Sequence, residues 1–394
     1  MNGPMKLVAP LVAALAVAAC SGGSSTVPTT SAGQSVSQSH SIPDWQAKGL
    51  ATRVCSDARP GLAQCDALLM TGKVQPNVSG WAPADFQARY NLPSSSKGSG
   101  QIIAIVDAYD NPNATSDLAA YRTQFGLGTA NFTKYNQLGQ TKNYPQGNKN
   151  WGLEEDLDIQ MVSASCPKCT IYLVEANSAY TNDLMTAEAE AVTLGAHVVS
   201  NSWGCPGSNN CVASSYFSTP GVVFMASAGD GGYGTQGPAA DANVVSVGGT
   251  VLSKSGSNYS ETAWRGTGSG CATGISKPSW QHDNGCTSRT MNDVSAVAWN
   301  AALYDTYGYG GWLTVGGTSV SSPLLAGVYG LAGNASSETA GKSFWTLKKK
   351  ARKKALHDIT SGTNGSCGGS YLCTAGAGYD GPTGWGTPNG VAAF

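Results

Sequence analysis

The sequence predicts an α/β fold in which helices flank a doubly wound parallel sheet. Four near-continuous apolar runs, at residues 101–107, 170–175, 197–202 and 222–227, have the composition of strands buried on both faces. Helical patterns at residues 116–125, 153–164 and 182–194 lie between or beside these runs, and this alternation is typical of a doubly wound sheet. The functional site of such a fold is expected beyond the carboxyl ends of the strands.

The composition agrees with a loop-rich secreted protein. Charged residues make up 12% of the 394 residues, and 51 residues are glycine. The formal net charge of -1 provides no excess of Lys and Arg to neutralise phosphates, so no nucleic-acid partner is expected. The pattern is regular from Trp81 onward, and residues 81–394 are therefore expected to form one domain.

The N-terminus predicts export. Lys6 precedes an apolar run over residues 7–19 that is too short to span a bilayer, so residues 1–20 are interpreted as a signal peptide. Its end resembles a bacterial lipoprotein cleavage site, in which Cys20 becomes lipidated; the alternative is an ordinary signal peptide with an incidental cysteine. Residues 21–42 have the composition of a flexible tether. We therefore expect a monomer that is secreted or held at the cell envelope, with Cys20 tethering it to a bacterial membrane.

Residues 43–80 are interpreted as a short extension or the remnant of a prosegment, and the sequence assigns them no fold. The chain has 11 cysteines, and those other than Cys20 fall into near neighbours, which predicts five local disulfides. The pairs are Cys55/Cys65, Cys166/Cys169, Cys205/Cys211, Cys271/Cys286 and Cys367/Cys373. Cys166 and Cys169 alternatively fit half of a redox or zinc site.

The most distinctive motif surrounds Ser319, which follows a Gly-Gly-Thr turn and precedes an apolar run. Because Pro323 is tolerated in a first helical turn, Ser319 is expected near a helix N-terminus, where the helix dipole favours developing negative charge. This placement suits a serine nucleophile. A plain glycine-rich turn is the alternative, since Gly-Gly-Thr recurs at residues 248–250 without a serine.

The expected partner of such a serine, a histidine in a catalytic context, is missing, so another group must activate it. Glu154 and Asp158 are four residues apart and would share one helix face. Two carboxylates held close raise the pKa of one of them, which makes a base or acid for mildly acidic conditions. The neighbouring Glu155 and Asp156 keep the assignment open, and a solvated acidic first turn is the alternative for the whole group.

Asp230 lies in a glycine-rich turn after an apolar run. A protonated carboxyl there could donate a hydrogen bond to an oxyanion. An ordinary turn aspartate is the alternative.

Together these segments resemble the sedolisin family of serine-carboxyl peptidases, which share a subtilisin-like fold. The match runs from about Trp81 to the C-terminus and includes four motifs in the family's order. The resemblance implies that Glu154 is the base, Asp158 its orienting partner, Ser319 the nucleophile and Asp230 the oxyanion-hole acid. It also implies that Ser202, Trp203 and Gly204 line the substrate cleft, and that Asp107 extends the carboxylate network.

The C-terminal region resembles the calcium loop of the same family. The implied ligands of one Ca²⁺ ion are the carboxylates of Asp358 and Asp380 and the carbonyls of Ile359, Gly376 and Gly378. Oxygen-only ligands suit a hard cation. A glycine-rich surface loop is the alternative.

The resemblance implies an acid-active endopeptidase that cleaves polypeptides through an acyl-enzyme on Ser319. One alternative is a catalytically silent surface lipoprotein that binds peptides or cell-wall components. An ordinary subtilisin would need a catalytic histidine, and the four histidines of the chain lie outside such a motif.

Overall fold

The computed structural model describes residues 1, 3, 44–55, 59, 61–71, 77–338 and 340–394. Apart from Met1 and Gly3, the predicted signal peptide, Cys20 and the tether lie outside the described residues. Within the described ranges, no helix combines the length and apolar character needed to cross a membrane. Residues Gln38–Phe394 form one compact unit.

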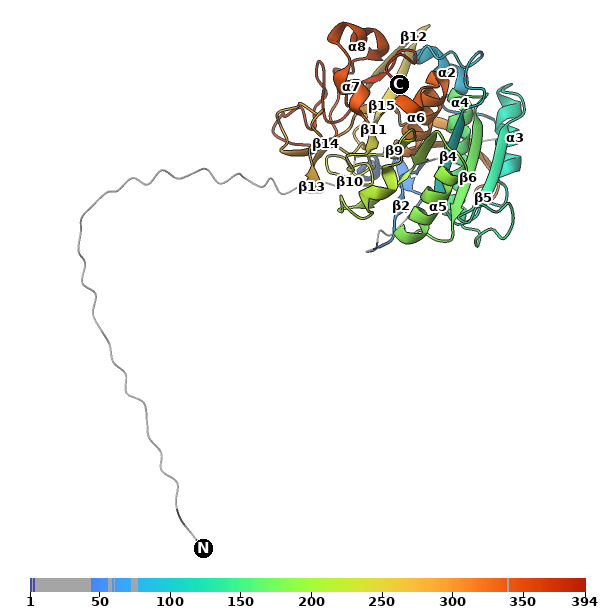
Figure 1. The fold of residues 1–394 in the computed structure, drawn as a ribbon. Coiled ribbons are helices and arrows are strands. Elements are labelled where there is room, and N and C mark those ends of the chain that lie inside the picture. The colour runs from blue at the N-terminus through green and yellow to red at the C-terminus, as the bar shows by residue number, and fades with distance from the viewer. Residues whose placement is uncertain (2, 4–43, 56–58, 60, 72–76, 339) are drawn as a thin grey trace, which may run out of the picture. The chain divides into compact units, whose positions relative to one another are not determined.

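An eight-stranded sheet, in the order β12-β11-β9-β7-β4-β6-β5 with β15 paired to β11, forms the centre of the fold. Every neighbouring pair is parallel except β11 and β12. Figure 1 shows β9, β4, β6 and β5 side by side. The strands are β4 (Ile102–Ala108), β5 (Asn131–Asn136), β6 (Thr170–Ala176), β7 (Val198–Asn201), β9 (Val223–Ser227), β11 (Val244–Ser255), β12 (Asn258–Ala263) and β15 (Val294–Val297). The four predicted strands and the α/β fold class are confirmed, and each strand end lies within one residue of its predicted position.

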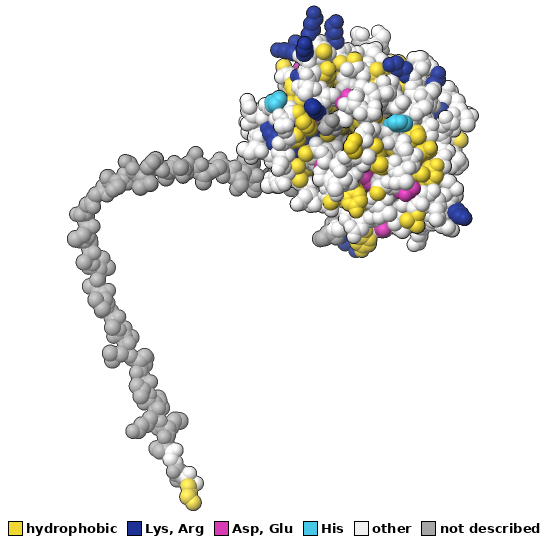
Figure 2. All heavy atoms as spheres, viewed as in Figure 1, with side chains coloured by type: hydrophobic (Ala, Val, Ile, Leu, Met, Phe, Trp, Pro, Cys, Tyr) yellow, Lys and Arg dark blue, Asp and Glu magenta, His cyan; other side chains and the backbone are white. Residues whose placement is uncertain are grey.

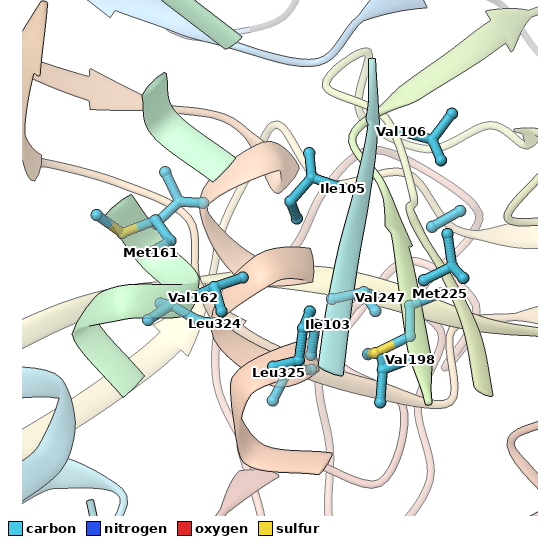
Figure 3. Packing of buried hydrophobic residues seen from close by; sticks show 14 of the residues in the cluster. Ile103, Ile105, Val106, Met161, Val162, Val198, Met225, Val247, Leu324 and Leu325 are labelled. Atoms are coloured by element: carbon cyan, nitrogen blue, oxygen red, sulfur yellow. The ribbon is translucent and has the colours of Figure 1, made fainter. Parts of the chain in front are cut away.

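Two adjacent helices, α4 (Lys149–Ser165) and α6 (Thr318–Ala332), pack on one face of the sheet. Figure 3 shows Ile103 and Ile105 of β4 pointing toward these helices, while Val106 points to the other side. The two helices approach closely, because a methyl group on Gly327 would lie only 1.9 Å from Oγ of Ser165. Glycine at this point of α6 therefore helps to hold α4 and α6 together.

The other long helices, α3 (Ala114–Gln124) and α5 (Thr181–Thr193), agree with the predicted ones to within two residues. The prediction for α6 needs one correction. This helix begins at Thr318 after the N-cap Gly317, so Pro323 lies inside the helix and not in its first turn. Ser319 is nevertheless in the first turn, as predicted.

The extension before Trp81 contributes strands to two smaller sheets. In one, β1 (Ala51–Arg53) and β3 (Leu68–Met70) join β17 (Gly311–Gly316) and β16 (Ala301–Asp305); in the other, β2 (Gln64–Cys65) joins β8 (Trp203–Pro206) and β10 (Gln236–Gly237). The remaining strands pair as β13 (Gly270–Ser276) with β14 (Ser288–Met291) and β18 (Leu356–His357) with β19 (Thr387–Pro388). The remaining helices are α1 (Asp44–Ala47), α2 (Pro83–Arg89), η1 (Ser214–Phe217), η2 (Ala335–Ser337), α7 (Lys342–Thr346) and α8 (Lys349–Ala355).

All five predicted disulfides are formed. Cys166 and Cys169 are therefore joined to each other and leave no thiolates for a zinc site. Lys and Arg side chains gather at the top of the view over α8 (Figures 1 and 2). Within this cluster, Cζ of Arg352 lies 3.5 Å from the centre of the Trp385 ring. This contact holds the guanidinium of Arg352 against the domain.

Candidate active site

The carboxylate pair lies in the middle of α4. The helix begins earlier than predicted because the Asn148 side chain accepts hydrogen bonds from the backbone N–H groups of Asn150 and Trp151. Glu154 and Asp158 are therefore well inside the helix and fully buried. The alternative of a solvated acidic first turn is wrong. The helix presents these two carboxyls, on one face, to the carboxyl end of β4.

Asp107 of β4 joins the pair. It is fully buried, and burial raises its pKa to about 8. Burial, followed by the charges of Asp158 and Asp107, raises the pKa of Glu154 well above its ordinary value. Burial and then Asp107 do the same to Asp158. The three carboxyls thus retain protons at pH values at which exposed carboxyls are ionised.

Ser319 meets this cluster from the first turn of α6. Its hydroxyl donates a 3.4 Å hydrogen bond to the carbonyl of Ser202. The oxygens of Glu154 have no partner of standard hydrogen-bond geometry among the described residues, yet Ser319 is close enough to favour the ionised form of Glu154 against the effect of burial. Helix α6 therefore brings the hydroxyl to the carboxylate that could accept its proton.

Asp230, after β9, lies on the other side of Gly317. Its Oδ1 accepts hydrogen bonds from the backbone N–H of Thr318 at 2.8 Å and from the Thr318 hydroxyl at 3.0 Å. Its Oδ2 is buried and has no hydrogen-bond partner among the described residues. Burial and then the charge of Asp66 raise the pKa of Asp230 well above its ordinary value. With Oδ1 engaged as an acceptor, a proton on Oδ2 would be free to be donated.

The predicted cleft residues Ser202, Trp203 and Gly204 lie beside these groups. Trp203 is fully buried and donates a 3.0 Å hydrogen bond from its indole Nε1 to the carbonyl of Val106. This contact fixes the start of β8 against the central sheet. The edge of β8 is paired with β2, so a strand of the chain itself lies in the predicted cleft.

The sequence interpretation missed the residues of this strand. Asp66, which follows β2, is buried and reaches the Asp230 turn. A cavity of about 330 Å³ adjoins it, lined by Arg53 and Gln64 of the extension and by Gln236 of the domain. The only sequence signal near Asp66 is the pairing of Cys65 with Cys55, which indicates a constrained loop but not its position.

The three histidines that the structure describes lie elsewhere, and His282 lines a pocket with Tyr371 and Trp385. Nδ1 of His197 accepts a hydrogen bond from the backbone of Ile102 at 3.0 Å. Nε2 of His357 lies 3.2 Å from the carbonyl of Arg89, near the C-terminal hairpin. These contacts leave carboxylates as the groups that surround Ser319.

The proposed calcium ligands do come together. The backbone N–H of Gly378 donates to Asp358 at 2.9 Å, and that of Gly376 donates to Asp380 at 3.0 Å. Burial is the main cause that raises the pKa of Asp380 to about 7, and the charge of Asp358 adds to it. Two carboxylates close together in one loop fit a hard cation.

A second acidic cluster was not predicted. One carboxylate oxygen from each of Asp117, Asp156 and Asp305 lies within 4.8 Å of the others, and all three residues are buried. Asp117 also accepts hydrogen bonds from Thr306, and Asp156 accepts one from Asn111. This cluster therefore has protein donors of its own, and Asp156 belongs to it instead of facing Ser319.

The fold and the site define a subtilisin-like α/β protein whose buried serine is surrounded by carboxyl groups. No protein-family profile matches the chain. The chain is 28% identical over 355 residues to sedolisin of Pseudomonas sp. (strain 101) and 28% identical over 347 residues to kumamolisin of Bacillus sp. (strain MN-32). Each alignment covers 79% of this chain, but the chain spans only 60% and 62% of these two curated relatives.

A solved structure gives the same result. Pseudomonas sedolisin, a serine-carboxyl proteinase complexed with two molecules of pseudo-iodotyrostatin, superposes with a TM-score of 0.69 at 28% identity, covering 79% of this chain and 96% of that one. Over 79% of its length, the chain is therefore similar in sequence and in fold to sedolisin. The subtilisin-like fold expected from the sequence is thereby confirmed.

The buried carboxyls predict how stability depends on pH. The folded state raises the pKa of Asp107 from 3.8 to about 8, so its stabilising contribution is complete below about pH 4 and is lost as the pH rises through about 8. At a fixed calcium concentration, thermal unfolding should therefore show a melting temperature that falls between pH 5 and pH 8. Asp107→Asn should make this fall smaller, and a wild-type melting temperature that rises over the interval would contradict the raised pKa.

Proposed function

We propose that the chain is a secreted, acid-active serine-carboxyl endopeptidase. The observation that carries the proposal is that the Ser319 hydroxyl, the buried Glu154 and Asp158 pair and the unpaired Oδ2 of Asp230 meet at the start of α6. The similar Pseudomonas sedolisin is a serine-carboxyl proteinase, which supports the same activity for this chain. The substrate class is polypeptides in extended conformation, because the segment of the chain that lies in the cleft is the extended strand β2, paired with β8.

The reaction would begin when Ser319 attacks the carbonyl carbon of the scissile bond and Glu154 accepts its proton. Asp158 orients Glu154, whose pKa is raised by burial and then by the negative charge of Asp158. Through the proton on Oδ2, Asp230 donates a hydrogen bond to the tetrahedral oxyanion, beside the positive end of the α6 dipole, and keeps that proton throughout. Glu154 then protonates the leaving amine, and water hydrolyses the acyl-enzyme with Glu154 acting again as base.

Substitution of the central groups tests this mechanism. Ser319→Ala and Glu154→Gln should each lower hydrolysis of denatured casein at pH 4 by at least about 10³-fold, because each removes one half of the nucleophile and base pair. Wild-type activity should fall as the pH rises and Asp230 loses its proton, since an ionised Asp230 cannot donate to the oxyanion.

The matched control is Ser321→Ala, two positions further along the same buried helix. The Ser321 hydroxyl donates to the carbonyl of Ala296 at 3.0 Å and takes no part in the proposed reaction. This variant should keep activity within a few-fold of wild type. Undiminished hydrolysis by Ser319→Ala would disprove the proposed nucleophile.

We also propose that one Ca²⁺ ion binds the C-terminal loop through the carboxylates of Asp358 and Asp380 and the carbonyls of Ile359, Gly376 and Gly378. The ion would neutralise two carboxylates and tie the loop to the end of β18. It supplies stability and takes no part in the chemistry at Ser319.

Removal of the metal tests this site. Chelation with EDTA at neutral pH should lower the melting temperature by several degrees, and excess Ca²⁺ should restore it. Asp380→Asn keeps an oxygen that can accept the hydrogen bonds from Thr383 but removes the negative charge. The melting temperature of this variant should therefore respond much less to EDTA. An equal response in wild type and variant would rule out Asp380 as a ligand.

Finally, we propose that Cys20 anchors the protein to a membrane through a lipid. Five formed disulfides support an oxidising compartment outside the cytoplasm. In a bacterial host, the wild-type chain should partition into the detergent phase on Triton X-114 extraction, whereas Cys20→Ser should move to the aqueous phase. Identical partitioning of the two proteins would contradict a lipid on Cys20.

A further inference from the structure

The segment from Gln64 to Leu68 passes through the cleft as one extended stretch of chain. On one side, β2 pairs antiparallel with β8, so that Gln64 faces Gly204 and Cys65 faces Trp203. On the other side, β3 pairs antiparallel with β17, so that Leu68 faces Gly316. Asp66 and Ala67 lie between these two pairings. An extended peptide that adds to exposed strand edges is a common way for a cleft to bind a polypeptide.

The backbone of Asp66 lies at the centre of the site. Its N–H donates to the carbonyl of Ser202 at 3.0 Å, and the Ser319 hydroxyl donates to the same oxygen at 3.4 Å. The nucleophile and the Asp66 amide are therefore neighbours. The carbonyl of Asp66 lies against Gly317, next to Asp230.

Gly317 makes this approach possible. Its φ of +108° lies in the region that favours glycine. A methyl group at this position would lie 2.0 Å from the carbonyl oxygen of Asp66 and 2.8 Å from Oδ2 of Asp230. The carbonyl oxygen of Asp66 thus occupies the space beside the unpaired Oδ2 of Asp230, where the oxyanion of a substrate would form.

The side chain of Asp66 fills a polar pocket. Its Oδ2 accepts a 2.6 Å hydrogen bond from the Ser227 hydroxyl and a 2.7 Å hydrogen bond from Nε2 of Gln236. Asp66 is only 1% exposed. An apolar side chain in this pocket would leave both donors without an acceptor in a buried place, which is costly.

We propose, on the basis of the peptidase activity proposed above, that residues 64–68 bind as a substrate does and that Ser227 and Gln236 select aspartate immediately before the cleaved bond. Asparagine, which has the same shape and the same acceptor oxygen, fits the pocket as well. The bond of the chain itself that lies in register with Ser319 is Asp66–Ala67.

Cleavage of this bond is an ordinary hydrolysis. Ser319 Oγ forms an ester with the carbonyl carbon of Asp66 as the C–N bond to Ala67 breaks. The proton that Glu154 accepts from Ser319 passes to the nitrogen of Ala67. Water then splits the ester, which leaves a carboxyl group on Asp66 and restores the Ser319 hydroxyl, without any change of oxidation state.

Mapping of cleavage sites tests the selectivity. The full chain digests denatured casein at pH 4, and mass spectrometry identifies the residue that precedes each cleaved bond. In the wild type, aspartate and asparagine should be enriched there. Gln236→Leu removes one donor and should lower kcat/KM for a peptide with aspartate at this position at least about tenfold relative to the same peptide with leucine. The buried Gln137, which binds outside the cleft at Asn177, provides a control in Gln137→Leu, which should keep the preference.

Cleavage of casein without enrichment of aspartate or asparagine, or with the same enrichment in Gln236→Leu, would overturn the selectivity while leaving the peptidase activity established. No cleavage under any condition would instead contradict the proposed function. Recognition of the Asp66 side chain by the pocket is then tested by a measurement that needs no catalysis.

That measurement is hydrogen exchange in the full chain carrying Ser319→Ala. Amide protons of residues 64–70 should be protected from exchange both in the protein that keeps Asp66 and in the Asp66→Asn variant. They should exchange at least about tenfold faster in Asp66→Leu, because the pocket no longer holds the segment. Equal protection in Asp66→Leu would show that the pocket does not recognise the side chain and would overturn the proposal.

Discussion

The burial of the acidic face of α4 is the constraint on which the rest of the site depends. Carboxylates buried away from solvent are costly when ionised, so the fold favours their protonated forms. Helix α6 packs closely against α4, with Gly327 beside Ser165, and the first turn of the same α6 carries Ser319. One packing arrangement therefore brings together the acid cluster and the hydroxyl, and it also sets the pH range in which the cluster can hold protons.

Much of this arrangement could be predicted from the sequence. Continuous apolar runs identified the central strands, and the spacing of Glu154 and Asp158 placed them on one face. The sequence could not decide among four neighbouring acids, because the helix start depends on Asn148 and the packing on α6. The structure separates them. Asp156 turns to Asp117 and Asp305, whereas burial and then the charge of Glu175 raise the pKa of Glu155. Glu154 and Asp158 lie near Asp107. The predicted start of α6 is wrong because that prediction places Pro323 in the first turn, whereas this helix contains it in its interior.

The N-terminal extension could not be placed from its sequence, because short strands have little periodicity and depend on their partners. Strands β2 and β3 pair with β8 and β17 of the domain, and β1 pairs in turn with β3. Trp45 adds to this attachment, since its indole donates a 3.0 Å hydrogen bond to the carbonyl of Asp230. The extension and the turn that carries Asp230 are thus parts of one hydrogen-bonded assembly.

A ligand that is part of the chain also changes the competition for the cleft. The segment around Asp66 is tethered at both ends, so its local concentration is independent of protein concentration and, by comparison with short flexible linkers, is on the order of millimolar. A free peptide that binds the cleft as tightly as the segment displaces it only when its concentration exceeds this local concentration. A peptide that binds more weakly needs a proportionally higher concentration. Dilution therefore does not open the cleft, and the apparent affinity of any added inhibitor reports the strength of the internal competitor as much as its own.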